Sequence, residues 1–155
     1  MQVFVPYPSL KQSVMSLDPS RLGNQIYREC LTLATGGWPN HPVAKMWKHH
    51  TFFLCKYALN GLLELQNRGL YYPHIFEKFT RICNSVKDTG PPIWWGNEKV
   101  HNSHKANLLR KDYTYYSQFG WQYEVNPADA YYYPTINERE VLLLINQRMN
   151  NERRN

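Results

Sequence analysis

Residues 18–37 read DPSRLGNQIYRECLTLATGG, and this stretch decides the fold class. Its apolar residues stand four, four and three positions apart and form one stripe of an α-helix, at Leu22, Ile26, Cys30 and Leu33. Asp18 can cap the helix, proline is tolerated at its first position, and a glycine pair ends it. The stretch therefore predicts a helix from Pro19 to about Thr35.

The rest of the chain continues this helical pattern. Apolar spacing and Gly or Pro breaks predict further helices over 43–67, 73–87, 98–111 and 135–150, with a loop over 88–96. Thr135 and Glu138 have the spacing of a capping box, which opens the last helix. Residues 1–17 are expected to be extended because two prolines interrupt helical hydrogen bonding, and the aromatic segment 113–133 to be irregular.

Composition agrees with one folded domain. The chain has 155 residues, 43% hydrophobic and 19% charged, which is typical of a globular protein. We predict an all-α fold: a single compact multi-helix domain over residues 1–155, with an extended N-terminal segment and an irregular aromatic C-terminal region. The three cysteines form no CxxC pair and indicate neither a disulfide framework nor a zinc site. Neither a signal peptide nor an apolar run of about 18 residues is present, so a cytoplasmic protein without membrane contact is expected.

The formal net charge of +6 favours a polyanionic partner, most simply nucleic acid. Within the first predicted helix, Arg21, Gln25, Arg28 and Glu29 form a polar stripe. A carboxylate between guanidinium groups stays ionised and can move a proton or steady a developing cation. The same spacing also fits a solvated face with ordinary side-chain pairs.

Two further motifs carry histidines. In GWPNHP, residues 37–42, His41 is either held rigidly toward a cleft or serves as a cap of the next helix. His101 and His104 stand one turn apart, as metal ligands can, but no third ligand accompanies them, so we expect neither a metal site nor a cofactor. The cations after them suit phosphate contacts, at Lys105, Arg110 and Lys111.

An aromatic run follows these cations and includes Tyr115 and Tyr116. Aromatic side chains beside cations can stack on unpaired bases, and they can equally form a packed lid over the core.

Several of these motifs together resemble a known group of proteins. The combination of RLGNQ, YRE, GWPNHP with KMW, and SHKANLLRKD with YSQFGW resembles phage and bacterial proteins related to the pyrimidine-dimer DNA glycosylase (endonuclease V) family, over about residues 1–121. The resemblance implies an all-α domain that binds duplex DNA and flips a base. It also implies glycosidic cleavage followed by strand nicking, with a free N-terminal α-amine that forms an imine with the sugar. The ordinary pKa of an α-amine, about 7.7–8.0, leaves much of it neutral near pH 7.

Position by position, the resemblance makes Glu29 the catalytic carboxylate and Arg28 a phosphate or sugar contact. Arg21 lies near a DNA-contacting position of the family, and Tyr115 and Tyr116 match its aromatic DNA-contact segment. Because Gln2 is large, Met1 should be retained, and the reactive amine would then be that of Met1 itself. The alternatives are a non-catalytic binder of modified or damaged nucleic acid or nucleotide on the same fold, and a phage factor that contacts a protein partner.

Overall fold

The computed structural model describes residues 1–122 and 131–154. Its elements are α1 (Leu10–Ser16), α2 (Pro19–Asn24), the π-helix η1 (Gln25–Cys30), α3 (Leu31–Ala34), α4 (Pro42–Trp47), α5 (Thr51–Asn67), α6 (Pro73–Ser85), α7 (Glu98–Lys111), α8 (Tyr113–Tyr116), the 3-10 helix η2 (Ser117–Phe119) and α9 (Glu138–Arg154). The described part of the chain contains helices and no strand, which confirms the predicted all-α fold class.

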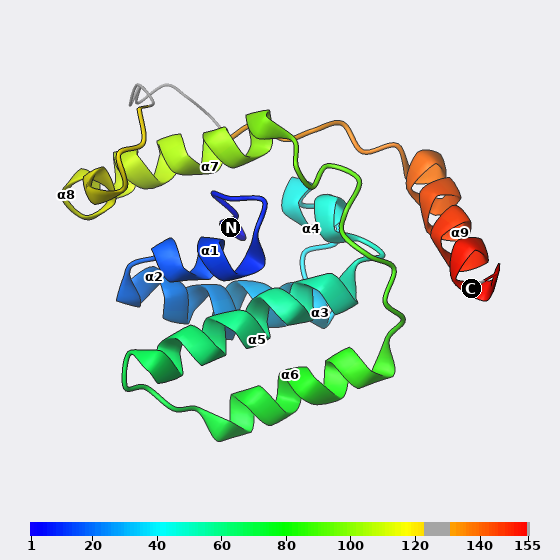
Figure 1. The fold of residues 1–155 in the computed structure, drawn as a ribbon, viewed down its shortest axis with the longest axis horizontal. Coiled ribbons are helices and arrows are strands. Elements are labelled where there is room, and N and C mark those ends of the chain that lie inside the picture. The colour runs from blue at the N-terminus through cyan, green and yellow to red at the C-terminus, as the bar shows by residue number, and fades with distance from the viewer. Residues whose placement is uncertain (123–130, 155) are drawn as a thin grey trace.

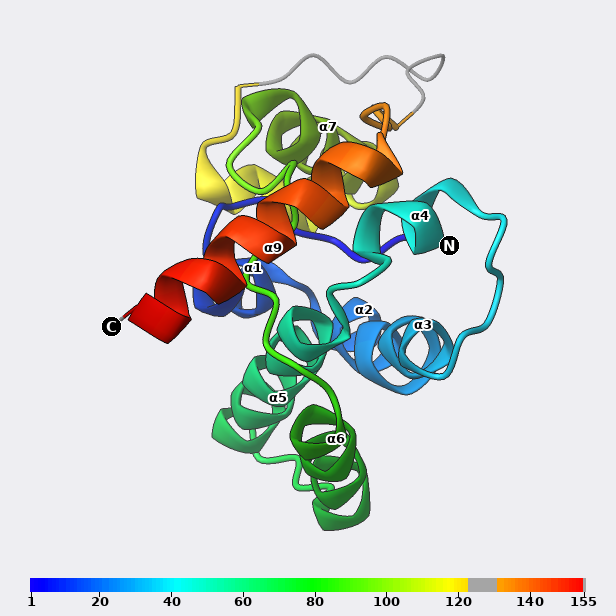
Figure 2. The ribbon, with the colours of Figure 1, turned by 90° about the vertical axis from the view of Figure 1, so that its right-hand side faces the viewer.

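The helices form layers around the N-terminal segment (Figure 1). One layer is the continuous run of α2, η1 and α3 with α1 beside it, and α5 packs between this layer and α6. The N-terminal segment passes between this layer and α7 on the opposite side. Figure 2 shows α9 crossing the side of the molecule in front of α1 and α7. The first residues of the chain are therefore enclosed by helices from both halves of the sequence.

The predicted apolar stripe forms the contact between η1 and α5. Leu22, Ile26 and Cys30 are fully buried, and Leu33 is half-buried. The approach of α5 depends on Gly61, since a Cβ atom there would lie 2.7 Å from Ile26 Cδ1. Close packing at this point positions the whole first helical run, which carries the polar stripe on its other side.

The first helical run begins as predicted, because the Asp18 side chain accepts a hydrogen bond from Arg21 N at 3.3 Å. It ends at Ala34 and contains a π-helical stretch, Gln25–Cys30, that periodicity does not reveal. Such π segments are rare and frequently mark functional sites. This one contains both Gln25 and Glu29.

Two predictions for the N-terminal half are wrong. Residues 10–16 are helical rather than extended, because Ser9 caps α1 through a hydrogen bond from Gln12 N to its Oγ at 3.2 Å. Both prolines precede this helix and interrupt none of its bonds. The helix predicted over 43–67 is two helices, α4 and α5, because His49 takes the left-handed φ of 72° between them.

The C-terminal half departs from prediction in two places. Residues 113–119 form α8 and η2 rather than irregular backbone, and the part of the aromatic segment from 123 to 130 lies outside the described residues. The cap of α9 is Asn137, whose Oδ1 accepts from Glu140 N at 3.2 Å, rather than Thr135. The helix also continues to Arg154, beyond the predicted end. The helices predicted over 73–87 and 98–111 are confirmed as α6 and α7.

Within residues 1–122 and 131–154, no helix has both the length and the apolarity needed to cross a membrane.

Candidate active site

The backbone of the N-terminal segment is held by side chains, beginning with one from η1. The Gln25 Nε2 donates to the Gln2 carbonyl at 2.8 Å, and the Gln25 Oε1 accepts from Phe4 N at 2.7 Å. From α5, the hydroxyl of Tyr57 donates to the Phe4 carbonyl at 2.8 Å. All of these groups are buried, so each bond satisfies a backbone group that has no access to water.

Two histidines of α7 hold the same segment at the next residue. Val5 N donates to His104 Nδ1 at 2.9 Å, and His101 Nδ1 donates to the Val5 carbonyl at 2.7 Å. The His101 Nε2 accepts from Gly96 N at 3.0 Å, which fixes its neutral tautomer. Burial lowers the pKa of His104 to about 3, and burial also lowers the pKa of His101. Both rings are therefore neutral, as their accepting nitrogens require.

We call these four side chains, Gln25, Tyr57, His101 and His104, the N-terminal clamp. Their bonds reach every residue from Gln2 to Val5 except Val3, whose N–H donates to the Gln2 Oε1 at 3.0 Å. Because the clamp fixes the backbone up to Gln2, it also fixes the position of the α-amine one residue earlier.

The clamp holds the chain terminus where its positive charge acts on Glu29 and His41. Burial raises the pKa of the Glu29 carboxyl, and the positive charges of the chain terminus and of Arg28 oppose that rise. Burial and the same terminal charge lower the pKa of His41. The charge of the chain terminus therefore acts on a side chain of η1 and on one at the start of α4.

Glu29 has an unusual environment for a carboxylate. Its Oε1 lies 3.7 Å from Arg28 Nε, whereas its Oε2 is buried and has no hydrogen-bond partner within residues 1–122 and 131–154. Buried polar atoms without partners are rare, and a catalytic role is one of the few reasons for keeping them. A carboxyl with a raised pKa beside an amine is suited to accept and return a proton near neutral pH.

His41 shows how one residue can meet both of its predicted descriptions. Its Nδ1 accepts from Val43 N at 3.1 Å, so it caps α4. Burial, and to a lesser extent the positive charge of the chain terminus, lowers the pKa of its ring. The GWPNHP motif therefore forms a helix cap, and its histidine lies within the influence of the terminal charge.

Positive charge flanks the site on the side of α2 and α7. Arg21 Nη1 lies 3.0 Å from Asp18 Oδ1. Partial burial and the neighbouring charges of Arg21 and Arg110 lower the pKa of Lys111, so these three cations lie together. Arg28 extends on another side of Glu29 with its side chain 70% exposed. A nucleic-acid backbone that passes over η1 would meet cations on both sides of this helix.

The aromatic run after α7 forms a packed lid rather than an open stacking surface. Tyr116 is fully buried, exchanges hydrogen bonds with the side chain and backbone of Asp18, and stacks on Trp121 with ring centroids 5.7 Å apart. Tyr115 is half-buried against Tyr116. On α7, the Lys105 Nζ lies 4.8 Å from the centroid of the Tyr7 ring.

The structure thus divides the predicted site residues. The charge of the Met1 terminus acts on both Glu29 and His41, and Arg28 adjoins Glu29. Arg21, Arg110 and Lys111 form a second group, in which the charges of the two arginines act on the lysine. Gln25, His101 and His104 are buried with their polar atoms directed at the N-terminal segment, which favours a structural role. Tyr57 belongs to the clamp although its sequence position indicates only a core residue.

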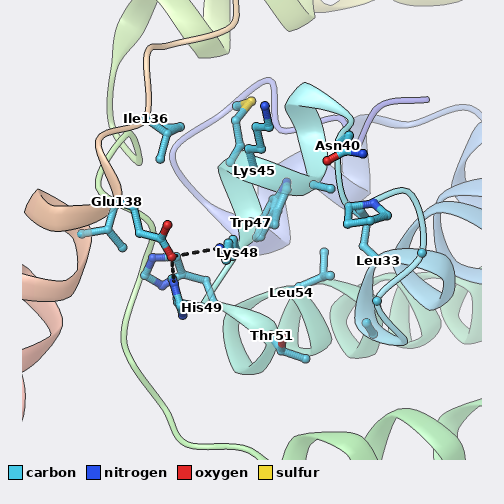
Figure 3. A pocket seen from close by; sticks show the side chains of 18 of the residues that line it. Leu33, Asn40, Lys45, Trp47, Lys48, His49, Thr51, Leu54, Ile136 and Glu138 are labelled. Carbon is cyan, nitrogen blue, oxygen red and sulfur yellow. Dashed lines mark hydrogen bonds and ion pairs between the residues drawn. The ribbon is translucent and has the colours of Figure 1, made fainter.

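A separate cavity of about 580 Å³ opens between α3, α4 and the start of α9 (Figure 3). At its rim, Glu138 Oε1 accepts from Lys48 Nζ at 2.9 Å and pairs with His49 Nε2 at 3.0 Å. Met1, Glu29 and His41 do not line this cavity. Among the residues that the structure describes, no group of three or more His, Cys, Asp or Glu side chains could hold a metal ion.

The fold is thus all-α, the chain has a formal net charge of +6, and the N-terminal segment is held by buried side chains near a carboxylate of raised pKa. The family of pyrimidine dimer DNA glycosylases matches residues 1–78, half of the chain. The chain therefore belongs to the pyrimidine dimer DNA glycosylase family, which relates it to DNA repair. The match includes Met1, Glu29 and His41. Neither a curated protein nor a solved structure gives a significant match.

Proposed function

We propose that the protein is a DNA glycosylase with abasic-site lyase activity, and that the α-amine of Met1 is its nucleophile. The observation that supports this proposal is the clamp, which fixes the N-terminal segment, together with the action of the terminal charge on the buried Glu29 carboxylate. Family membership supplies the substrate class, DNA.

In the reaction, the neutral amine attacks C1′ of a deoxyribose as the bond between C1′ and the base breaks. The base leaves with the bonding electron pair and takes up a proton. Loss of the amine proton and opening of the sugar ring then give an imine. Removal of a C2′ proton expels the 3′ phosphate, which nicks the strand, and water releases the enzyme. Glu29 accepts and returns these protons, because burial raises its pKa and its Oε2 has no other partner.

The cations around η1 hold the DNA backbone. Arg28 contacts the phosphates next to the reacting sugar, and Arg21, Arg110 and Lys111 contact the backbone farther along. A sugar in a stacked duplex cannot reach an amine in a half-buried position, so the target nucleotide leaves the stack. Duplex DNA with one displaced nucleotide is therefore the proposed substrate.

The decisive experiment is borohydride trapping on labelled duplex DNA, in which the reagent reduces an imine to a stable covalent adduct. One duplex carries an abasic site and another is irradiated with ultraviolet light. The intact mass of the protein first establishes that its N-terminus is Met1. Glu29→Gln should lower the trapping rate strongly and leave duplex retention in a gel shift unchanged. Glu77→Gln is the matched control, because Glu77 is exposed on α6.

An adduct whose peptide maps to Met1 supports imine chemistry at this amine. Duplex retention without an adduct supports a non-catalytic binder instead. Neither adduct nor retention would mean that this chain lacks the activity of its family.

A further inference from the structure

Trp38 stands out among the tryptophans because its indole is exposed next to the candidate active site. The chain has five tryptophans. Trp47 and Trp94 are buried, Trp95 and Trp121 are half-buried, and Trp38 is 46% exposed. A large exposed aromatic side chain loses hydrophobic free energy unless it contacts something. Because the other four indoles are buried or half-buried, the exposure of Trp38 points to a contact outside the chain.

The backbone of Trp38 is strained. Its φ is 51°, in the left-handed region that glycine or asparagine adopts at lower cost. Such strain persists only where the surrounding structure imposes it, and it concentrates at functional sites. A bulky aromatic residue at this position costs conformational energy, and 46% of its surface still remains exposed.

The loop that carries Trp38 is tied down on both sides. Gly37 N donates to the Thr32 carbonyl at 2.8 Å, and His41 N donates to the Trp38 carbonyl at 3.0 Å. Gly37 fits closely against α3, since a Cβ atom there would lie 2.4 Å from Thr32 Cγ2. Pro39 follows and fixes one more backbone angle. The indole therefore projects from a rigid loop.

The position of the indole is next to the reactive groups. Its ring centroid lies 6.4 Å from that of His41, and the two ring planes are 36° apart. The positive charge of the terminal amine contributes to the lowered pKa of His41. Figure 2 shows the loop between α3 and α4 curving around the N-terminus.

We propose that Trp38 inserts its indole into the base stack of duplex DNA beside the nucleotide that the Met1 amine attacks, and so keeps that nucleotide out of the stack. This inference rests on the proposed function. Apolar side chains inserted between base steps unstack DNA, and an indole recovers the lost stacking through its own faces. Trp38 is thus a positioning residue: it makes no bond to the reacting atoms.

The binding test uses tryptophan fluorescence and a duplex that carries a tetrahydrofuran abasic analogue, which cannot form an imine. Insertion of the exposed indole should quench part of the emission of the wild type. Trp38→Phe should bind the same duplex without that quenching. An equal emission change in both proteins would overturn the proposal, because the signal would then come from another tryptophan.

The kinetic test compares borohydride trapping on duplex and on single-stranded DNA with the same abasic site. Trp38→Ala should lower the duplex rate about 10- to 100-fold, the worth of one stacked base, and leave the single-strand rate unchanged. Trp38→Phe should recover part of the duplex rate. Phe76→Ala is the control, since Phe76 is 37% exposed on α6, on the far side of α5 (Figure 1).

A duplex rate unchanged in Trp38→Ala, or an equal fall on both substrates, would overturn the role of Trp38 and leave the proposed function intact. A wild type that forms no adduct on either substrate would instead refute the proposed function. The fluorescence comparison then still decides whether the indole enters the duplex.

Discussion

Replacing Gln25 by leucine should release the N-terminal segment without unfolding the protein. The leucine keeps the approximate size of the side chain and removes both of its bonds to the segment, at 2.7 Å to Phe4 N and 2.8 Å to the Gln2 carbonyl. Each buried backbone group left without a partner costs about 1–3 kcal/mol, so the two together cost about 2–6 kcal/mol. That is comparable to the whole stability of many domains, about 5–15 kcal/mol.

The N-terminal segment has a less costly alternative, which is to detach from the clamp so that water hydrates Phe4 N and the Gln2 carbonyl. We therefore expect Gln25→Leu to expose residues 1–4 while the helices stay folded, because the buried apolar contact of Leu22, Ile26 and Cys30 with α5 remains and only the bond from Tyr57 Oη to Gln25 Oε1, at 3.3 Å, is lost between the two helices. Displacement of the Met1 amine by about 1 Å is enough to slow trapping about 100-fold. The fall in the trapping rate of Gln25→Leu should thus be much larger than its change in the free energy of unfolding alone would lead one to expect.

Hydrogen exchange at Phe4 N, read together with the trapping rate, measures the effect. The variant should exchange this proton much faster than the wild type, with exchange in α5 nearly unchanged. Gln66→Leu, on the exposed face of α5, is the matched control. If Gln25→Leu traps DNA at the wild-type rate with a protected Phe4 N, then the clamp does not position the amine.

Two further predictions concern stability. The pKa of His104 is lowered to about 3, so the unfolded chain binds its proton below about pH 6.5 while the folded protein does not. The free energy of unfolding should fall by up to about 1.4 kcal/mol per pH unit from pH 6.5 toward pH 3, and His104→Asn should flatten this slope. The measurement is the urea midpoint at pH 7 and at pH 4.5. An equal shift of the midpoint in the wild type and in the variant would contradict the role of His104. Gly61→Ala should destabilise the protein by about 1–3 kcal/mol because its Cβ meets Ile26 at 2.7 Å. Gly23→Ala has open space and should instead stabilise it by about 0.5–1 kcal/mol; thermal unfolding that gives both the same sign would refute this reasoning.

The sequence predicted those features that depend on neighbouring residues. The stripe from Leu22 to Cys30 and the cap at Asp18 follow from local spacing, and they place α2 well. The Ser9 cap is equally local, but the nearby prolines made an extended segment the expected structure. The break at His49 could not be predicted, because a non-glycine residue with a positive φ has no sequence signature.

The candidate site was only partly predictable for a different reason. Spacing shows Arg28 and Glu29 in one polar stripe, and the resemblance to known proteins gives them and the Met1 amine their roles. The structure adds the clamp that fixes the N-terminal segment. The spacing of His101 and His104 shows that they share a face of α7, but not whether that face meets solvent or the interior. Their partner, Val5, is 96 and 99 residues away, and no periodic pattern encodes a bond between a side chain and so distant a backbone.

That separation has a consequence for how the protein matures during synthesis. The ribosome makes Val5 first and His104 99 residues later, so the part of the clamp that comes from α7 does not exist while most of the chain is being translated. Throughout that interval the first residues remain open to the enzymes that trim and acetylate nascent chains. The fate of the α-amine is therefore settled before the fold can protect it, and a chain modified at this stage would fold around a terminus that can no longer react.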